Sequence, residues 1–529
     1  MKKTPIVVMI FLVVAIGLIY AAKKAIPIIR NRVQLQTSDA KGLKGKMTLA
    51  VDDWIGYYPL SSSRMKKYMR SEGYLLDVAN DGADYPARMK KLQSGELNFA
   101  VVTVDSYILN AAPLDFPGVI ILVIDESKGG DAMVANTNIV RNLDTFNERG
   151  MTTSQGGAKI AYTASSPSEH LLKTISSHFN VPGLKNLNKD LRVKTASSDE
   201  AFNLFKEGKV PVAILWEPNV SKALKLPYTG KIIGTESMSG VIVDILVVNR
   251  DFAAKNPEQV DLLLKTYFRV LKFYADNPED EKKDIATDQK LPAESIREML
   301  SGVAMVNLSR NCQEWFGIAG PGQIAEQGLV DTIGSTVSIL MENGDFKDSP
   351  LPDKDPYRII NSTFVSQIYE NAVKTGFASL DGAAGAAAGT GLDRPFKALS
   401  DAQWAALSSV GKIKIEPVAF QSGLASLDVS EKEKLDAMVN RLKHYPTFRI
   451  VVGGHTSTDG DASANQELSQ ERADAVARYL SVTYTIDQNR IRSVGYGGSK
   501  PLPKLPDESS RAYGYRLPRV EISLLAESY

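Results

Sequence analysis

The stretch that decides the fold of the C-terminal part of the chain is GGHTSTDGDASANQELSQERADAVARYL, residues 453–480. It predicts the end of a strand, then a polar loop, then a helix, because small and polar residues separate an apolar run from a segment with helical periodicity. The loop contains one histidine and a cluster of hydroxyls and acids, and Arg472 is expected one helical turn into the helix. We expect such a loop to hold a polar ligand.

The segments on both sides of this stretch predict a compact α+β domain over residues 412–529. Ser430, with Glu433 three residues later, has the pattern of a capping box and predicts a helix that runs to His444. The other elements follow from alternating or helical apolar patterns. They are strands at 413–420 (IKIEPVAF), 448–454 (FRIVVGG), 491–497 (IRSVGYG) and 518–525 (PRVEISLL), and a helix over Leu468–Leu480.

This region resembles the C-terminal peptidoglycan-binding domain of outer-membrane protein A (OmpA) and its relatives. The resemblance implies that one face of the loop binds the diaminopimelate of a wall peptide. The implied site consists of Thr456, Ser457, Asp459, Asn465 and Arg472. The family motif appears here as Gly454-His455-Thr456-Ser457, Gly460, Asn465, Leu468-Ser469 and Arg472-Ala473, followed by RIRSVGYGGSKPL (490–502).

Two positions depart from the family pattern. In the family an aspartate binds the ammonium group of diaminopimelate and an arginine binds its carboxylate, but this chain has Ser457 where the aspartate is expected. Loss of a charge-assisted hydrogen bond, worth about 1.5–3 kcal/mol, would weaken binding roughly ten- to a hundredfold. Asp459 could supply the missing charge. The family's Asn-Arg-Arg-Val is also replaced, by Leu517-Pro518-Arg519-Val520.

The same loop offers little to a metal ion. His455 is interpreted as a hydrogen-bonding residue at the strand end, since the chain has only four histidines and they are scattered. The acids and amides at alternate positions from Asp459 to Asn465 are similar to a calcium loop, but the required glycine and terminal glutamate are absent. We therefore predict no metal site and no cofactor.

Residues 46–375 alternate between apolar strand-like runs and helical segments, which indicates α/β sheets with parallel strands. The part from 255 to 375 is mostly helical by pattern. The predicted strands are MTLAVDDW (47–54), 75–78, LNFAVVTV (97–104), VIILVID (119–125), KIAYT (159–163), VAILW (212–216) and VIVDILVVN (241–249), and the earlier helices are Ser61–Glu72, Tyr85–Ser94 and one that starts at Ser168.

This region resembles the periplasmic substrate-binding proteins of the nitrate, taurine and sulfonate type. Four stretches occur in the family's order: VDDWIGYYPL (51–60), RMKKLQSGELNFAVVTVDSYIL (88–109), AILWEPNVSKAL (213–224) and VDILVVNRDFAAKNPEQV (243–260). The resemblance covers residues 46–372. It implies two α/β lobes joined by crossing strands, with a small ligand closed between them.

Candidate ligand-binding side chains follow the predicted strands, where ligands of α/β sheets bind. Because acids but no lysine or arginine accompany them, a cationic, zwitterionic or hydroxyl-rich ligand is favoured over an anion. Ser168 either helps to hold an anion or simply caps a helix, and the tryptophans either line the cleft or pack the lobes. The full set is Trp54, Tyr57, Asp105, Ser165, Ser166, Ser168, Trp216, Glu217 and Asp244.

Residues 376–411 predict a flexible linker, because the small-residue centre GAAGAAAGTG (382–391) cannot bury a core. A short helix is expected within it at Asp401–Ser408. About 35 residues would average roughly 33 Å end to end as a coil and could stretch to about 115 Å. We therefore expect the C-terminal domain to reach outward while the lobes stay near the membrane.

Residues 1–24 predict a transmembrane anchor, since Pro5–Ala22 carries no charge over about 18 residues. The alternative is a cleaved signal peptide, which would need a shorter apolar core and a small-residue cleavage site, whereas Tyr20 and two alanines lead directly into Lys23. Residues 25–45 are basic and predict a juxtamembrane spacer. Both folded parts need the periplasm for the roles above, which predicts a single-pass inner-membrane protein with a cytoplasmic N-terminus.

Composition argues against other classes of protein. Lysine and arginine total 62 against 61 acids, a net charge of +1, which does not suggest a nucleic-acid partner. The single cysteine, Cys312, excludes an intramolecular disulfide and is expected to be a small core residue. The chain has no Gly-x-Ser-x-Gly elbow, Walker loop or His-Glu-x-x-His motif, so we predict that it is not an enzyme.

Together these features predict an α/β protein with an N-terminal transmembrane helix, a two-lobed periplasmic-binding-protein fold and a small α+β OmpA-like domain. Its predicted function is to bind a small solute between the lobes and peptidoglycan through the C-terminal domain, with a transporter of the ABC type or a signalling protein as a possible membrane partner. The alternative is a structural envelope tether, or a component of a stress or defence complex, in which the lobes dock a protein.

Overall fold

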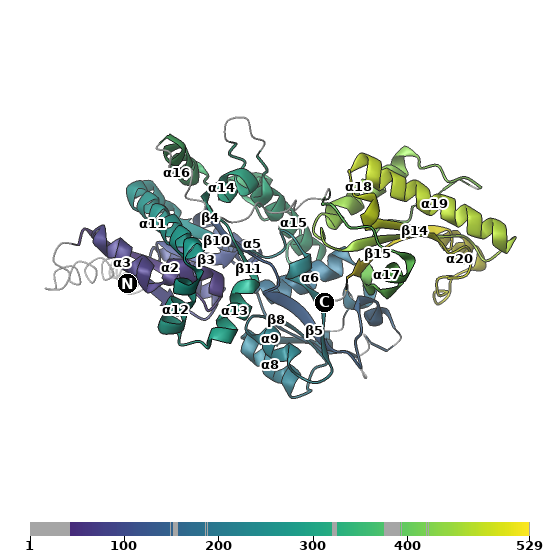
Figure 1. Cartoon of the computed structure of the whole chain (residues 1–529), viewed down its shortest axis with the longest axis horizontal. Helices are drawn as coiled ribbons and strands as arrows, with labels where there is room; N and C mark the ends of the chain where they lie inside the picture. The colour runs from purple at the N-terminus through teal and green to yellow at the C-terminus, as the bar shows by residue number, and fades with distance from the viewer. Residues whose placement is uncertain are drawn as a thin grey trace, which may run out of the picture.

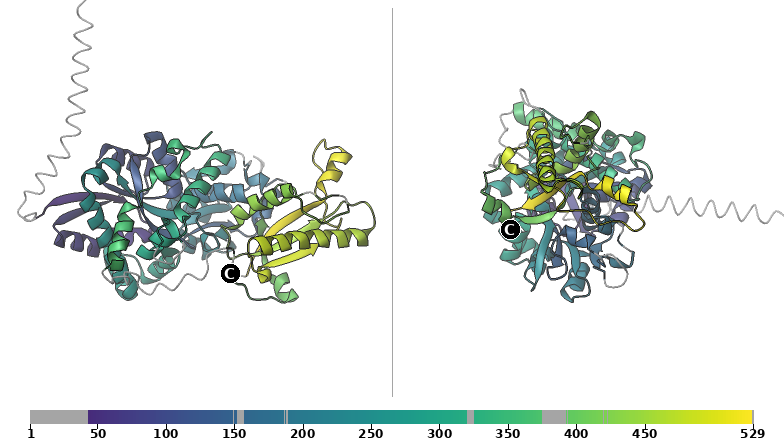
Figure 2. Two further views of the ribbon diagram at one scale, coloured as in Figure 1. Left: turned by 90° about the horizontal axis from the view of Figure 1, so that it is seen from above. Right: turned by 90° about the vertical axis from the view of Figure 1, so that its right-hand side faces the viewer.

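The computed structural model describes residues 43–148, 150–151, 157–185, 187, 189–319, 325–374, 392, 394–418, 420–421 and 423–527. They form two α/β lobes and a C-terminal α+β domain, with the first lobe at one end of the molecule and the C-terminal domain at the other (Figures 1 and 2). The predicted anchor at residues 1–24 and most of the spacer lie outside the described part. Within that part, no helix is both long and apolar enough to cross a membrane.

The first lobe is built on a six-stranded sheet in the order β11-β4-β10-β3-β1-β2. β1, β2 and β3 are parallel, but β10 runs antiparallel to both of its neighbours. The expectation of purely parallel sheets is therefore wrong, because β10 returns from the second lobe and enters this sheet from the opposite end. The strands are β1 (Gly45–Val51), β2 (Tyr74–Asn80), β3 (Phe99–Thr103), β4 (Gly118–Ser127), β10 (Val243–Asn249) and β11 (Val303–Met305).

Helices cover both faces of this sheet, which is why its strands read as continuous apolar runs. Helices α3, α11 and α16 pack on one face, with Cys312 fully buried among them as expected, and α4, α5 and α15 pack on the other. The helices of this lobe are α2 (Tyr58–Ser61), α3 (Ser63–Ser71), α4 (Tyr85–Ser94), α5 (Val104–Ala111), α10 (Arg250–Lys255), α11 (Pro257–Asp276), α12 (Pro278–Gln289), α13 (Ala293–Ser301), α14 (Leu308–Arg310), α15 (Gly328–Glu342) and α16 (Thr363–Lys374).

The second lobe has a five-stranded sheet in the order β7-β6-β8-β5-β9. Helices α8 and α9 cover one face of it, and α6 covers the other. All twelve residues of α6 are buried, which is unusual for a helix of a two-layer lobe and shows that a third layer lies beyond it. The elements are β5 (Asp131–Asn136), β6 (Ile160–Thr163), α6 (Pro167–His178), α7 (Pro182–Lys185), β7 (Arg192–Thr195), α8 (Ser198–Lys206), β8 (Val212–Trp216), α9 (Asn219–Leu224) and β9 (Thr229–Gly234).

Two crossings join the lobes, from β4 to β5 and from β9 to β10. Thr235 of the second crossing ties them together, because its Oγ1 accepts hydrogen bonds from the N–H groups of Gly129 (2.9 Å) and Asp131 (3.2 Å). Its Oγ1 also lies 2.8 Å from the hydroxyl of Ser127. The two crossings therefore hold the start of β5 beside the returning chain.

The C-terminal domain has a four-stranded sheet in the order β12-β15-β13-β14, with α18 and α19 packed against it. β15 shows strict alternation of buried and half-buried residues, as expected for a strand with one face in the core. The elements are α17 (Asp401–Ala406), β12 (Ser408–Lys412), α18 (Val429–Leu442), β13 (Arg449–His455), α19 (Ala462–Thr483), β14 (Ile491–Gly495), α20 (Ser510–Arg516) and β15 (Arg519–Ala526).

The first strand of this domain lies earlier than predicted. Residues 413–420 do not form a strand; instead Ser408–Lys412 forms β12 and pairs with β15. The ladder stops because the N–H of Lys414 donates to the carbonyl of His178 in the second lobe (2.7 Å), and Pro417 has no N–H to donate. The predicted boundary at residue 412 therefore falls at the end of β12.

Both long helices of the domain also begin earlier than predicted. The carboxylate of Asp428 caps α18 by accepting the N–H of Glu431 (3.0 Å), so Ser430 is not its cap. Asp461 caps α19 by accepting the N–H of Ala464 (2.8 Å). Because α19 begins at Ala462, Arg472 lies in its third turn rather than its first.

The described end of the predicted linker is folded onto the domain. Arg449 and Arg490, which are both buried, lie with their guanidinium carbons 5.1 and 5.4 Å from the ring of Phe396, and Arg449 lies 5.5 Å from the ring of Trp404. Arg449 also donates to the carbonyl of Lys397 (2.9 Å). These cation–π contacts and the hydrogen bond fix residues 394–406, so this part does not serve as a flexible spacer.

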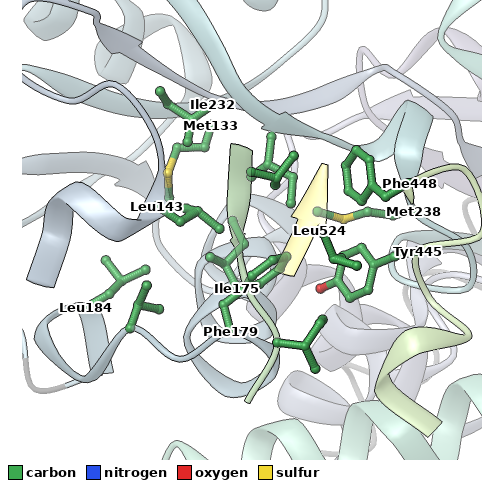
Figure 3. Close-up of a cluster of buried hydrophobic side chains, with 14 of the residues drawn as sticks. Met133, Leu143, Ile175, Phe179, Leu184, Ile232, Met238, Tyr445, Phe448 and Leu524 are labelled. Atoms are coloured by element: carbon green, nitrogen blue, oxygen red, sulfur yellow. The ribbon is translucent and has the colours of Figure 1, made fainter. Parts of the chain in front are cut away.

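The layer beyond α6 consists of α15 from the first lobe and, at the C-terminal end of α6, the C-terminal domain. Apolar side chains of the second lobe and of the C-terminal domain form one continuous core, in which Ile175 and Phe179 meet Tyr445 and Leu524 (Figure 3). The rings of Phe179 and Tyr445 are 5.1 Å apart in an edge arrangement. In this structure the C-terminal domain therefore packs on the second lobe instead of reaching away from it, and separating the two would expose this core to water.

Backbone hydrogen bonds also connect the second lobe to the C-terminal domain at this shared core, which we call the joint. The N–H of Asn180 donates to the carbonyl of Lys412 (2.7 Å), and the N–H of Ser239 donates to the carbonyl of His444 (2.9 Å). At Gly411 an added Cβ would lie 3.1 Å from the side chains of Leu143 and Phe179. The chain thus approaches the second lobe too closely there for a larger residue to fit without movement.

We predict that Phe179→Ala uncouples the C-terminal domain from the lobes. Removing a buried phenylalanine lowers the free energy of unfolding by about 3–5 kcal/mol. Here the lost packing is between the second lobe and the C-terminal domain. Scanning calorimetry of the full chain should show one shared unfolding transition for the native protein and two for the variant. Phe205→Ala, which removes a buried ring on the opposite face of the second lobe, is the control and should lower stability without splitting the transition. The same number of unfolding transitions in both variants would contradict the role of Phe179 in coupling the C-terminal domain to the lobes.

Two histidines from the two sides of the joint are stacked. The rings of His178 and His444 lie 5.1 Å apart at 27°. The Nδ1 of His178 is 3.0 Å from the hydroxyl of Tyr445, and the Nδ1 of His444 donates to the carbonyl of Ser239 (2.7 Å). Burial lowers the pKa of both imidazoles, that of His178 well below its usual value. Both rings are therefore neutral at pH 7.

We predict that acid weakens the joint. A histidine with a lowered pKa in the folded protein contributes stability that is complete above its ordinary pKa of about 6.5 and is lost as the pH falls through that value toward the folded one. His444→Gln cannot take up a proton, so between pH 7.5 and 5 its melting temperature should fall less than that of the native chain. Identical slopes for the two proteins would show that the pair does not sense pH.

Candidate functional site

A small cavity lies between the two lobes, at the position expected for a ligand. Its volume is about 30 Å³, room for about two water molecules. Three acids, four aromatic residues and three smaller residues line it. They are Asp52, Asp131, Asp244, Trp54, Tyr57, Tyr85, Trp216, Thr103, Pro167 and Ile242.

The crossing strands bring two carboxylates together at the back of the cavity. Asp125 of β4 and Asp244 of β10 are direct partners in the antiparallel ladder. The indole Nε1 of Trp54 donates to Asp125 (3.1 Å), and the hydroxyl of Tyr57 donates to Asp244. Burial raises the pKa of Asp125 to about 7, with the charges of Glu126 and Asp52 adding to the effect. Burial and the charge of Asp125 raise the pKa of Asp244 well above its usual value. The pair therefore holds at least one proton under mildly acidic conditions.

We predict that Asp244→Asn stabilises the protein at alkaline pH. A carboxyl with a raised pKa contributes stability that is complete below its ordinary pKa of about 4 and is lost as the pH rises toward the folded value. The amide avoids this loss, so the melting temperature of Asp244→Asn should exceed that of the native chain at pH 8 and approach it at pH 5. Asp251→Asn changes an exposed aspartate and should have little effect at either pH. A variant that is less stable than the native chain at pH 8 would contradict the claim that ionisation of Asp244 beside Asp125 destabilises the fold.

The third acid of the first lobe has its own counter-ion. Asp52 accepts from Arg88 (3.2 Å) and from the N–H of Trp54 (3.1 Å). Arg88 is fully buried and also donates to Asp81 through Nε (2.9 Å) and Nη2. Its guanidinium is therefore shared between two carboxylates within the first lobe.

The structure places four of the nine predicted ligand residues at the cavity. Trp54, Tyr57, Trp216 and Asp244 line it. Trp54 also belongs to the core of the first lobe, so its two predicted roles coincide. The others do not line the cavity: they are Asp105, Ser165, Ser166, Ser168 and Glu217. Asp105 accepts from the hydroxyl of Ser106 (3.1 Å), and Glu217 accepts from the hydroxyl (2.7 Å) and N–H (3.1 Å) of Ser221.

The expected anion site before α6 is already occupied by a side chain of the protein. The N–H of Ser165 donates to the carboxylate of Glu169 (2.8 Å), and Ser166 caps the helix by accepting the N–H of Ser168 (3.2 Å). Ser168 is therefore not the cap. A bound anion would have to displace Glu169, so this end of the helix does not favour one.

Sequence reasoning missed several acids and aromatics of this site. Asp52 and Tyr85 lie within segments already assigned to elements, and Asp125 lies on β4. Asp131 begins β5 at the crossing between the lobes. Asp52 could have been recognised from the sequence, because it stands two residues before Trp54. Asp131 could not, because its role depends on how the second lobe closes on the first.

The second candidate site surrounds the loop between β13 and α19. Gly454 lets the end of β13 approach α19 closely, since an added Cβ would lie 2.0 Å from the carbonyl oxygen of Ser469. This contact places Arg472 beside the loop. His455 is buried, stacks on Tyr496 with ring centres 5.2 Å apart, and lies 3.5 Å from Glu521. Neither of its ring nitrogens has a hydrogen-bond partner among the described residues, so the ring packs in the core without the predicted hydrogen bond.

Arg472 is buried without an acidic partner among the described residues. Its guanidinium donates to the backbone carbonyls of Leu424 (3.2 Å) and Gln421 (3.5 Å) and lies 5.0 Å from the ring of Phe420. Only 5% of Arg472 is exposed, and burial lowers its pKa. A buried cation that makes only two neutral hydrogen bonds, both long, remains able to bind a carboxylate.

Hydrogen bonds between side chains and backbone groups hold the loop between β13 and α19. The hydroxyl of Ser457 accepts the N–H of Asp459 (3.0 Å), and Asn465 donates to the carbonyl of Asp459 (2.8 Å). Thr456 is buried and donates to the carbonyl of Ser457 (3.2 Å). The carboxylate of Asp459 is exposed and makes no hydrogen bond or ion pair with a described residue, so it is available to a ligand.

The chain joins two kinds of module, a two-lobed α/β part and a C-terminal α+β domain. Residues 419–513 match the OmpA family, so the OmpA-like domain predicted from the sequence is confirmed. The chain is 36% identical over 107 residues to the probable lipoprotein YiaD of Escherichia coli and 31% identical over 110 residues to the peptidoglycan-binding protein ArfA of Mycobacterium tuberculosis. These matches cover 20% and 21% of this chain, and the chain spans only 47% and 33% of those relatives.

Solved structures similar to the two lobes are periplasmic binding proteins. The aliphatic sulphonate binding protein SsuA of Escherichia coli aligns with 60% of this chain and 92% of its own length, at 16% identity and a TM-score of 0.45. The nitrate-binding protein NrtA of Synechocystis aligns with 62% of this chain and 88% of its own length, at 12% identity and a TM-score of 0.44.

Proposed function

We propose that this protein binds peptidoglycan through its C-terminal domain and a small solute between its lobes, within the cell envelope. The observation that carries the wall-binding role is Arg472, a buried arginine without an acidic partner among the described residues. It lies on the helix that follows the loop, in which the Asp459 carboxylate is exposed. In this proposal Arg472 binds the carboxylate of diaminopimelate. Asp459 binds its ammonium group, in place of the family's aspartate, whose position is occupied here by Ser457. The name of the mycobacterial relative supports the same role.

The solute-binding role is supported by the cavity between the lobes. Residues from both sheets line it, so a ligand would contact both lobes at once. We further propose that residues 1–24 anchor the chain in the inner membrane, which would place both sites in the periplasm. A membrane transporter or a signalling protein would then be the partner that responds to the bound solute.

The alternative proposal is a structural tether whose lobes dock a protein rather than a solute. The observation that favours it is the joint itself, since the second lobe already packs a whole protein domain against α6. The two proposals share the wall-binding site and differ in whether the cavity between the lobes takes a ligand.

We predict that a diaminopimelate-containing wall peptide binds the full chain and that Arg472→Ala abolishes this binding. Asp459→Ala should weaken it about tenfold or more, because one charge-assisted hydrogen bond is lost. Ser457→Asp should tighten it. Calorimetric titration of the full chain is the appropriate measurement, because the isolated domain would expose the core that it shares with the second lobe.

Arg511→Ala is the matched control, since Arg511 is an exposed arginine of α20 in the same domain. It should bind the peptide as the native chain does. Retention of binding by Arg472→Ala would overturn the site. A silent native chain that is restored by Ser457→Asp would show that the domain has lost its hold on the wall.

A further inference from the structure

The charges around the cavity between the lobes are not balanced. Asp52, Asp131 and Asp244 line it, and the described residues that line it include no lysine, arginine or histidine. Asp52 is paired with Arg88, and Asp244 accepts from Tyr57 while it opposes Asp125. The remaining carboxylate, Asp131, has no cationic partner in the described part of the chain.

Asp131 is the only contribution of the second lobe to this set of acids, and one of its oxygens is free. Its Oδ2 accepts from the hydroxyl of Ser127 (2.7 Å), but its Oδ1 accepts no hydrogen bond from a described residue. Only 2% of Asp131 is exposed. An ionised carboxylate in such a place is costly unless a cation or a hydrogen-bond donor reaches it.

The other walls of the cavity suit a cation. Trp54 and Tyr57 come from the first lobe and Trp216 from the second, and the faces of aromatic rings attract cations. A sulfonate or nitrate would meet three carboxylates and no cationic partner. A zwitterion would also lack a partner for its carboxylate, because Arg88 is committed to Asp52 and Asp81.

The size of the cavity and the free acceptor restrict the cation further. About 30 Å³ accommodates one or two non-hydrogen atoms when the lobes are as close as here. A quaternary ammonium group is too large for this space and has no N–H to donate to Asp131. A primary ammonium group is small enough and brings three donors.

We propose that the cavity binds the ammonium head group of a small primary amine, with Asp131 as its charge partner and hydrogen-bond acceptor and with Trp54 and Trp216 as its walls. This inference rests on the proposed solute-binding function and names the class of solute. The head group bridges the lobes, because Asp131 belongs to the second lobe and Trp54 to the first.

The pKa of the acid provides a second readout. Burial raises the pKa of Asp131 to about 7, and Asp105 on α5, Asp125 on β4 and Glu217 after β8 add to the effect. An incoming ammonium ion requires the ionised form. Affinity should therefore rise from pH 6 to pH 8, and protons should be released when the amine binds near pH 7.

The test is calorimetric titration of the full chain with methylammonium in amine-free phosphate buffer at constant ionic strength. Tetramethylammonium and methanesulfonate are the comparison ligands. We expect saturable binding of methylammonium, with no detectable heat from the other two. Asp131→Asn should weaken binding by about tenfold or more, because a charge-assisted hydrogen bond becomes a neutral one. Asp131→Glu keeps the charge and should retain most of the affinity.

Asp251→Asn, on the exposed face of α10, is the matched control and should bind as the native chain does. Melting temperatures of all variants separate loss of binding from loss of folding. Binding of methanesulfonate, or equal affinity of native and Asp131→Asn chains for methylammonium, would overturn the ligand class while leaving the solute-binding function in place. If no small ligand binds but the wall peptide does, the solute-binding function itself is overturned and the tether proposal stands.

Discussion

The structure depends on one apolar joint, in which the second lobe and the C-terminal domain share a single hydrophobic core. Phe179 and Tyr445 belong to elements more than 250 residues apart in sequence, yet their rings meet edge to face inside it (Figure 3). Burial of apolar surface is the dominant favourable term in folding, so this joint sets the position of the loop between β13 and α19 relative to the lobes. It also explains why β12 ends where Lys414 turns to bond the second lobe.

Helix α6 connects the two candidate sites through this joint. Its first residue, Pro167, lines the cavity between the lobes, and its last residue, His178, stacks on His444 of the C-terminal domain. A rigid helix of twelve residues spans about 18 Å. The cavity and the C-terminal domain are thus joined by one buried element, with no flexible segment between them on that path.

Much of the architecture could be predicted from local patterns. Strands β3, β8 and β10 lie within the apolar runs that predicted them, and β1 and β4 overlap theirs, because strands covered on both faces read as uninterrupted apolar segments. The motif from Gly454 to Arg472 predicted the loop between β13 and α19, and the glycine is needed because no side chain fits against Ser469. The predicted first residues of α18 and α19 were less accurate. Asp428 and Asp461 cap these helices, but other polar residues nearby are equally suitable as caps by sequence.

The candidate ligand site was predicted only in part. Trp54 and Asp244 follow or begin strands and were recognised for that reason, whereas Asp131 was not, because its importance comes from the approach of the second lobe to the first. Ser165, Ser166 and Ser168 looked like an anion site in sequence, but Glu169 folds back on the same N–H groups. Local sequence could not show which partner a free donor would find.

The sequence by itself therefore determined the kinds of module and their order, since periodicity and short motifs act over neighbouring residues. Only the tertiary structure decided that the modules share a core and that residues 394–406 are pinned by Arg449 and Arg490. It also decided which acids surround the cavity and that only one of them, Asp52, has a counter-ion among the described residues. These features arise from contacts between segments far apart in the chain, and the free energy of such contacts depends on burial and geometry that no local pattern contains.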